Sequence, residues 1–335
     1  MKIAIVGCGT MGQTFARIVG AMPNAELVGI YNHSPHTAKA FAESLGTKWY
    51  SSYDELLATK QLELVIITLP TYLHKAYTIR AAAYGKHIIC EKPIALNPKD
   101  AEEMLHACDR AGVRLFVGHV LRFFPEYMHA RKQITEGAIG TIGIVRAKRA
   151  SLHPPANSWF ADSGKSGGVI FDLMIHEIDF IRSLLGEVRS VYAAGKRAAG
   201  FEYAAVTMRF ENGAIANAEA VWGHPASFHS KLDIFGTDGV LRCDSQSSRP
   251  LVLHRSDSGS AAEAEGVVLP EAPSRQDPFA LEIEHFIDCI RNRKEPVVTA
   301  ADACEAVAVA RMASESIETG KPVYKTHEAD RRADG

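Results

Sequence analysis

The sequence predicts an α/β domain with a doubly wound parallel sheet, followed by an α+β domain built on a large, open and mainly antiparallel sheet. A glycine-rich turn, GCGTMG, follows a short β-branched run at the N-terminus, and apolar runs then alternate with helical patterns up to about residue 118. Beyond that point apolar and polar residues alternate, and the runs end in glycine or Asn-Gly turns. We therefore expect domains at 1–118 and 119–325 and a polar tail at 326–335.

The composition excludes several classes of protein. The 335 residues are 47% hydrophobic and 23% charged, and the net charge of -2 leaves no basic footprint for nucleic acid. No apolar run approaches the length of about 18 residues that a membrane span needs. Met1-Lys2 leads straight into a strand pattern, and the six cysteines show no C-x-x-C spacing. We expect a soluble, cytoplasmic protein.

The first domain is predicted from five buried strands, each followed by a helix except the last. Helix starts carry Ser34-Pro35 and Asn97-Pro98, which combine an N-cap with a proline at the first helical position, and Gly112 closes one helix. The strands are expected at 3–6, 25–31, 62–68, 86–92 and 114–119, and the helices at 14–22, 34–46, 71–85 and 97–112.

The turn after the first strand predicts a dinucleotide site. Gly7 would permit the tight turn, Gly9 would allow a close approach of the pyrophosphate, and Gly12 would allow close packing of helix on strand. Thr10 and Met11 lie within this turn and are expected to contact the cofactor, and the N–H groups and dipole of the helix that follows favour phosphate. This Rossmann arrangement places ligands at the carboxyl ends of the strands.

The end of the second strand bears on the choice of cofactor. An acidic residue there would accept the ribose hydroxyls and favour NAD, but the sequence has Tyr31-Asn32-His33-Ser34. Asn32 and Ser34 can donate to a 2′-phosphate and His33 can add positive charge, although no arginine is present. The same residues also suit a turn and N-cap. The cofactor is expected to be NADP or NAD, with a slight preference for NADP.

The second domain is expected to begin with one or two helices over 125–137. Strands follow at 188–197, 203–210, 214–222, 230–236 and 239–244, with helices at 278–292 and 300–318 and polar loops at 244–250 and 255–266. An open sheet with exposed β-branched residues is usually covered, and a second copy of the chain, in a homodimer or homotetramer, is the expected cover.

A helix predicted over 171–185 is apolar nearly all round, which is typical of an interior helix. However, Asp172, His176, Asp179 and Ser183 fall on one narrow stripe of it. If this helix packs at the domain junction, the stripe lines the cleft that receives the nicotinamide. The alternative is a buried Asp–His pair in which the two side chains only satisfy each other.

Several motifs in order resemble the Gfo/Idh/MocA family of NAD(P)-dependent sugar and polyol oxidoreductases, over nearly the whole chain. They are HIICEKPIALN, TLPTYLH, GHVLRF, GGVIFDLMIHEID, FGTDGVL and the terminal segment from IEHFIDCIRNRKEP to TGKPV. The resemblance implies that Lys92, Asp172 and His176 are the catalytic trio. It implies cofactor contacts by Pro70, His74 and Glu91, whereas Leu69-Pro70-Thr71 departs from the family's usual Thr-Pro-Asn.

Oxidation of a secondary alcohol needs a group that takes the hydroxyl proton. A buried Lys92 with a lowered pKa, or His176, can do so near neutral pH, and Asp172 can orient His176 and stabilise its charged form. Other polar residues are candidate substrate contacts that could equally serve loops or the core: His119, Arg122, His153, Asn157 and Trp159. A zinc site formed by His119, His153, Asp172 and His176 lacks paired-ligand spacing, so no metal is expected.

Three classes of function stay open. The first is a dehydrogenase or reductase acting on a sugar, inositol or related polyol. The second is a variant with tightly held NAD that performs redox-assisted glycoside cleavage or epimerisation. The third is a dinucleotide-sensing regulator without catalysis, which the presence of Lys92, Asp172 and His176 disfavours.

Overall fold

The computed structural model describes residues 1–225, 228–247, 251–255 and 277–325. The chain forms two compact units, and both are assembled from separate stretches of the sequence. Among the described residues, the first unit comprises those within 1–120, 162–167 and 277–308, and the second comprises those within 121–161, 168–255 and 309–325. Residues 248–250 of the predicted loop at 244–250, residues 256–266 of the predicted loop at 255–266 and the tail at 326–335 lie outside the described residues.

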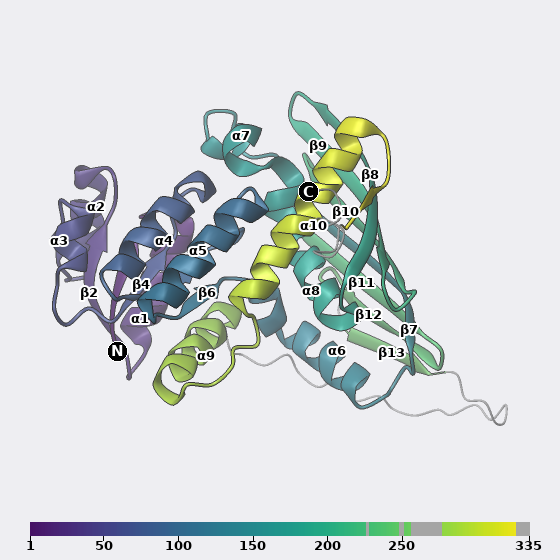
Figure 1. The fold of residues 1–335 in the computed structure, drawn as a ribbon, viewed down its shortest axis with the longest axis horizontal. Coiled ribbons are helices and arrows are strands. Elements are labelled where there is room, and N and C mark those ends of the chain that lie inside the picture. Colours follow the sequence, from purple (N-terminus) through teal and green to yellow (C-terminus); the bar gives the residue numbers. More distant parts are fainter. Residues whose placement is uncertain (226–227, 248–250, 256–276, 326–335) are drawn as a thin grey trace, which may run out of the picture. The chain divides into compact units, whose positions relative to one another are not determined.

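The first unit contains a six-stranded parallel sheet in the order β3-β2-β1-β4-β5-β6, and Figure 1 labels β2, β4 and β6 of this sheet. Its strands are β1 (Lys2–Val6), β2 (Glu26–Tyr31), β3 (Trp49–Tyr50), β4 (Leu64–Ile67), β5 (His87–Cys90) and β6 (Leu115–Val117). The strand order reverses direction between β1 and β4. Right-handed crossovers therefore place the helices after β1 and β2 on one face and those after β4 and β5 on the other. This confirms the predicted doubly wound sheet.

Two helices of the first unit begin where the sequence predicts caps. The Ser34 hydroxyl accepts from Thr37 N, and the Asn97 side chain accepts from Asp100 N. The helices are α1 (Thr10–Ala21), α2 (Pro35–Ser44), α3 (Tyr53–Leu57), α4 (His74–Ala83), α5 (Pro98–Ala111) and the short α7 (Ser163–Ser166). Although it comes late in the sequence, α9 (Pro278–Asn292) belongs to this unit, where Phe286 stacks on Phe116 at 4.7 Å.

The second unit contains an eight-stranded sheet in the order β13-β12-β11-β7-β10-β9-β8-β14. Its strands are β7 (Ile142–Ser151), β8 (Val188–Ala198), β9 (Phe201–Phe210), β10 (Ile215–Trp222), β11 (His229–Gly236), β12 (Gly239–Asp244), β13 (Leu251–Arg255) and β14 (Val323–Tyr324). All neighbouring pairs are antiparallel except β7 and β10. The predicted open, mainly antiparallel sheet is confirmed.

Strand β7 was not predicted from the sequence, where no element was expected at 142–151. Charged residues obscured its alternation, because Arg146 and Lys148 point to one face while Val145 and Ala147 are buried on the other. Arg149 is buried as well, which a pattern of apolar residues cannot predict. Because β7 runs parallel to β10, the carboxyl ends of these two strands lie side by side, as the strand ends do in the parallel sheet of the first unit.

Helices α6 (Pro125–Thr135) and α8 (Ile175–Leu185) pack on the sheet of the second unit, where α8 contacts β7 and β10 and α6 contacts β12. Helix α10 (Ala300–Thr319) contributes residues to both units. Short helical turns are η1 (Thr71–Leu73), η2 (Val120–Phe123), η3 (Trp159–Ala161) and the π-helical turn η4 (Ile170–Met174). Among the described residues, no helix is both long and apolar enough to cross a membrane.

Candidate active site

The glycine turn of the first unit is closely packed at two of its three glycines. Gly7 has φ +111°, and a Cβ there would lie 2.7 Å from Thr68 Oγ1. A Cβ on Gly12 would lie 2.0 Å from the Gly7 carbonyl oxygen. A larger residue at Gly12 would therefore push α1 away from the turn, and one at Gly7 would collide with Thr68 at the end of β4.

Gly9 differs from its neighbours because its Cα faces open space. It is the N-cap of α1 in an extended conformation, with φ −71° and ψ −171°, and a Cβ would have no atom within 4 Å. The backbone N–H groups of Thr10 and Met11 stand at the helix start, where an anion is favoured. This cradle fits a pyrophosphate.

At the end of β2, Asn32 is partly exposed and His33 is exposed. The Ser34 hydroxyl is engaged as the cap of α2 and also accepts from Thr37 Oγ1 at 3.0 Å. Of the three polar side chains that the sequence offered to a 2′-phosphate, Asn32 and His33 are thus the two that helix capping does not use.

A pocket of about 420 Å³ lies beside Tyr31, the last residue of β2. The rings of Tyr53 and Tyr77 line it, with centroids 4.8 Å apart, together with an ion pair between Arg80 and Asp54. Burial raises the pKa of Tyr53 and of Tyr77, so both hydroxyls stay protonated. The pocket offers aromatic faces and hydrogen-bonding groups next to the cofactor cradle.

His74 joins the two loops that follow β4 and β5. Its Nε2 lies 2.8 Å from the Leu69 carbonyl oxygen and its Nδ1 lies 2.9 Å from that of Pro93, and the ring is 1% exposed. Burial lowers the pKa of His74, although the backbone carbonyl groups oppose this shift. Pro70 opens the turn η1 between these contacts. The arrangement supports an indirect role for His74, because it holds the loops rather than facing solvent.

Glu91 and Lys92 follow β5 directly. The Glu91 carboxylate accepts from Lys92 N at 3.0 Å and lies beside Gly118, at the end of β6 and next to the buried His119. The Lys92 side chain is partly exposed, which corrects the expectation of a buried lysine. Strand ends thus gather Glu91, Lys92 and His119 on one edge of the sheet.

In the second unit, Asp172 and His176 are more exposed to solvent than their neighbours in the sequence. From Ile170 to Arg182, every residue except these two is buried. The predicted single α-helix is corrected, since residues 170–174 form the π-helical turn η4 and the α-helix starts at Ile175. A π-helical turn is rare and is often found at functional sites.

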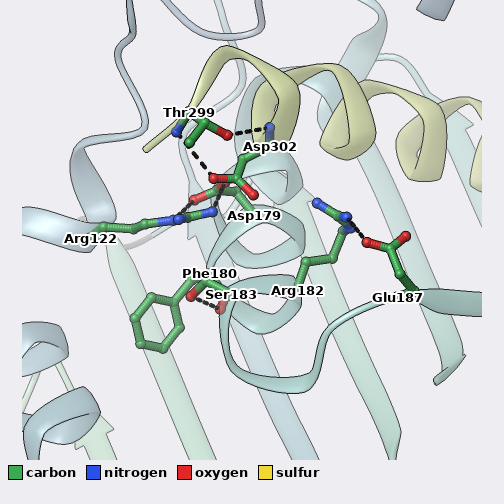
Figure 2. A network of polar contacts seen from close by, with 8 residues as sticks. All are labelled: Arg122, Asp179, Phe180, Arg182, Ser183, Glu187, Thr299 and Asp302. Carbon is green, nitrogen blue, oxygen red and sulfur yellow. Dashed lines mark hydrogen bonds and ion pairs between the residues drawn. The ribbon is translucent and has the colours of Figure 1, made fainter. Parts of the chain in front are cut away.

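The remaining members of the predicted stripe have other partners (Figure 2). Arg122 donates from Nε and Nη2 to the two carboxylate oxygens of Asp179 at 2.8 and 2.6 Å, and both side chains are buried. The Ser183 hydroxyl donates to the Phe180 carbonyl oxygen at 2.7 Å. This pairing favours a structural role for Arg122 and Asp179 over the substrate contact expected for Arg122.

A second buried ion pair joins β7 to α8 and was not predicted from the sequence. Arg149 on β7 donates from Nε to Glu177 Oε1 at 2.7 Å, and the residues are 6% and 2% exposed. Burial alone would lower the pKa of Arg149, but Glu177, followed by Tyr127 and Asp172, outweighs it and raises that pKa. Asp172 is thus one of the negative charges that stabilise the charged form of Arg149.

The carboxyl ends of the parallel strands β7 and β10 meet next to η4, which contacts both strands. Ser151 O accepts from the backbone N–H groups of Gly223 and His224 at 3.0 and 2.9 Å. The His153 ring lies 6.0 Å from that of Trp222, edge to face, and His224 Nδ1 is buried without a hydrogen-bond partner. His224 was missed from the sequence, where the strand end at WGH was the available signal.

The loop after β7 carries the other candidate substrate residues. His153 Nδ1 lies 2.7 Å from the Pro154 carbonyl oxygen, and Asn157 is exposed. Trp159, in η3, stacks on Phe160 with centroids 3.9 Å apart. Lys92 and His119 belong to the first unit, whereas Asp172, His176, Arg122, His153, Asn157 and Trp159 belong to the second. Within the described ranges, no group of three histidine, cysteine, aspartate or glutamate side chains could hold a metal ion.

Comparison with known families accounts for both units. Residues 1–119 match the Gfo/Idh/MocA model described as an oxidoreductase family with an NAD-binding Rossmann fold. Residues 131–324 match the model of that family's C-terminal alpha/beta domain. The chain belongs to the Gfo/Idh/MocA oxidoreductase family. The resemblance stated from the sequence is confirmed, and so is its implication of an NAD-binding oxidoreductase.

Relatives of this family member cover most of its length. A scyllo-inositol 2-dehydrogenase (NAD(+)) of Bacillus subtilis is 30% identical over 96% of this chain and 96% of its own. A 2,7-anhydro-N-acetylneuraminate hydratase of Escherichia coli is 34% identical over 73% of this chain and 68% of its own. The solved structure of a levoglucosan dehydrogenase complexed with NADH and levoglucosan shares the fold, with a TM-score of 0.87, 24% identity and coverage of 98% and 100%.

Proposed function

We propose that this oxidoreductase transfers a hydride between a nicotinamide cofactor and a secondary alcohol or ketone of a sugar, inositol or related polyol. The observation that carries the proposal is the buried segment from Ile170 to Arg182, in which Asp172 on the π-helical turn and His176 on the first turn of α8 are the two partly exposed residues. The inositol dehydrogenase of Bacillus subtilis, similar over nearly the whole chain, supports the substrate class.

The cofactor would be held by the first unit. Gly7, Gly9 and Gly12 and the N–H groups of Thr10 and Met11 fit its pyrophosphate, and the pocket beside Tyr31 suits the adenosine half. Pro70, His74 and Glu91 shape the loops after β4 and β5. When bound, the nicotinamide supplies the acceptor for the hydride.

The chain itself supplies proton transfer. We assign Lys92 or His176 as the group that takes the hydroxyl proton and returns it in the reverse direction. Asp172 orients His176 and stabilises its protonated form by its negative charge. His119, His153, Asn157 and Trp159 remain proposed substrate contacts, and we add His224 because its buried Nδ1 has capacity for a hydrogen bond.

We propose that NADP is accepted as well as NAD and is slightly preferred. No carboxylate follows β2 to repel a 2′-phosphate, and Asn32 and His33 are not used by the helix cap. The family description and the relative from Bacillus subtilis name NAD, so the proposal concerns this chain's own residues at the strand end.

A homodimer or homotetramer through the second sheet is proposed from one face of that sheet. Ile144 lies between Ile215 and Phe235 on neighbouring strands, and Ile144 and Tyr192 are 41% and 48% exposed on the face opposite α8. A second copy would cover this row. We also propose a cytoplasmic setting, because the six cysteines are unpaired thiols.

One alternative has specific support. The hydratase of Escherichia coli is 34% identical to this chain, so a reaction without net oxidation, with tightly held NAD, is a second candidate. This alternative would be favoured if dialysed enzyme retains its dinucleotide and converts substrate without exchanging that dinucleotide with the solution.

The experiment is a panel of inositols, sugars and anhydrosugars assayed with NAD and NADP in parallel. The proposal predicts that reduced cofactor accumulates in the bulk solution with at least one polyol or sugar. Conversion of a substrate without accumulation of reduced cofactor would support the alternative. If no compound is converted and no reduced cofactor accumulates, the assigned substrate class is contradicted.

A further inference from the structure

The π-helical turn that carries Asp172 is fastened at its start to the β8–β9 hairpin. Val169, the residue before the turn, donates its backbone N–H to Glu202 Oε1 across 3.1 Å. Val169 is buried, and the Glu202 side chain on β9 is 14% exposed. A buried N–H at a helix start needs an acceptor, and here a carboxylate supplies it.

The preceding glycine explains why the carboxylate can approach so closely. Gly168 has φ +69°, and a Cβ there would lie 2.3 Å from Glu202 Oε1 and 2.8 Å from Arg197 Nη2. Glycine is therefore required at this position for its conformation and for space. The second glycine of the GGVIFD segment makes room for the charged pair.

Arg197 fixes the carboxylate in place. Its Nη2 donates to the same Glu202 Oε1 at 2.7 Å, and the two residues are direct cross-strand partners on β8 and β9. The Glu202 oxygen that accepts from Val169 N is thus also bound by Arg197 on the neighbouring strand β8. Because Val169 lies three residues before Asp172, a shift of its N–H moves the turn that presents Asp172.

We propose that Glu202 is a positioning residue, whose carboxylate sets the place of Asp172 by binding the backbone N–H of Val169, the residue before its turn. The inference rests on the proposed function of Asp172, but it makes a separate structural claim about residues 169–176. If Glu202 only stabilised the sheet, its replacement would not raise the hydrogen exchange rate of residues 169–176 above that of the surrounding segments.

The test compares Glu202→Ala and Glu202→Gln with the control Glu219→Ala, an exposed glutamate on the adjacent strand β10. Hydrogen exchange of a peptide covering 169–176 is measured first, without substrate. We expect faster exchange in Glu202→Ala only, because the glutamine amide oxygen can still accept from Val169. Unchanged exchange in Glu202→Ala overturns the proposal, whatever the enzyme acts on.

Kinetics with a substrate from the panel give the second readout. Glu202→Ala should lower kcat at least about tenfold with an unchanged dinucleotide Kd, since a displacement of about 1 Å can cost a hundredfold in rate. Glu202→Gln should recover most of the rate. Wild-type kcat in Glu202→Ala, or equal losses in both variants that follow the fall in Tm, overturns it. A wild-type enzyme inactive on the whole panel would instead contradict the proposed function and leave the exchange result to decide the structural claim.

Discussion

Arg149 on β7 and Glu177 on α8 form an ion pair in the interior of the second unit, with Arg149 Nε 2.7 Å from Glu177 Oε1. Removing one partner leaves the other charged and buried, so Glu177→Leu should reduce the free energy of unfolding by about 3–5 kcal/mol. The double variant Arg149→Met, Glu177→Leu should recover most of this loss. Urea unfolding measures both, and a double variant as unstable as the single one would contradict a paired role.

The glycine turn gives a matched pair of substitutions. Gly9→Asp should fold normally, because a Cβ at Gly9 meets no atom within 4 Å, yet lose dinucleotide affinity at least tenfold, about 1.4 kcal/mol, through steric and charge repulsion of the pyrophosphate. Gly12→Ala should instead destabilise the fold, since its Cβ would lie 2.0 Å from Gly7 O. Calorimetry and thermal melts separate the two effects. Wild-type affinity in folded Gly9→Asp would exclude this turn as the phosphate site.

His74 should make the first unit sensitive to acid. Burial lowers the folded-state pKa of His74 below its ordinary value of 6.5, so the unfolded chain binds the proton more readily. The stability contributed by neutral His74 is present above the unfolded pKa and is lost as the pH falls through and below it.

The measurement is the free energy of unfolding between about pH 7.5 and 5.5 for the wild type and His74→Gln. The decline with acid should be shallower in the variant. His87 and His285, whose pKa values burial also lowers, account for a remaining slope. An identical slope in both proteins would show that His74 does not titrate in this way.

The strand end at Asn32 tests the choice of cofactor. Asn32→Asp would restore an acceptor for the ribose hydroxyls and repel a 2′-phosphate, so the ratio of kcat/KM for NADP to that for NAD should fall. Asn32→Ala serves as the control, because it removes the amide without adding charge. A wild type that already prefers NAD by a large factor would refute the proposed preference for NADP.

Much of the fold could be predicted because its signals are local. The glycine turn at Gly7 and the caps at Ser34 and Asn97 act within a few residues of where they stand in the sequence. Strand β7 could not be predicted, since the burial of Arg149 depends on a glutamate that comes 28 residues later.

The candidate site was predicted in part for the same reason. Periodicity selected Asp172 and His176, which are the partly exposed residues of their segment, but it also selected Asp179. Its partner Arg122 is distant in the sequence, so the buried pair was not visible there. The π-helical turn and the Glu202 contact depend on tertiary packing, which helical spacing does not report.

We propose that Lys92, Asp172 and His176 perform acid–base chemistry rather than support the fold. Single-turnover hydride transfer, measured beside thermal melts and dinucleotide binding, tests it in Lys92→Ala, Asp172→Asn and His176→Ala. Ser183→Ala is the control, because it lies on the same helix and its hydroxyl donates to the Phe180 carbonyl. We expect rates about 10²–10⁴-fold lower in the three variants, with dinucleotide Kd and Tm near those of the wild type. Normal hydride transfer in a folded His176→Ala or Lys92→Ala enzyme would contradict it.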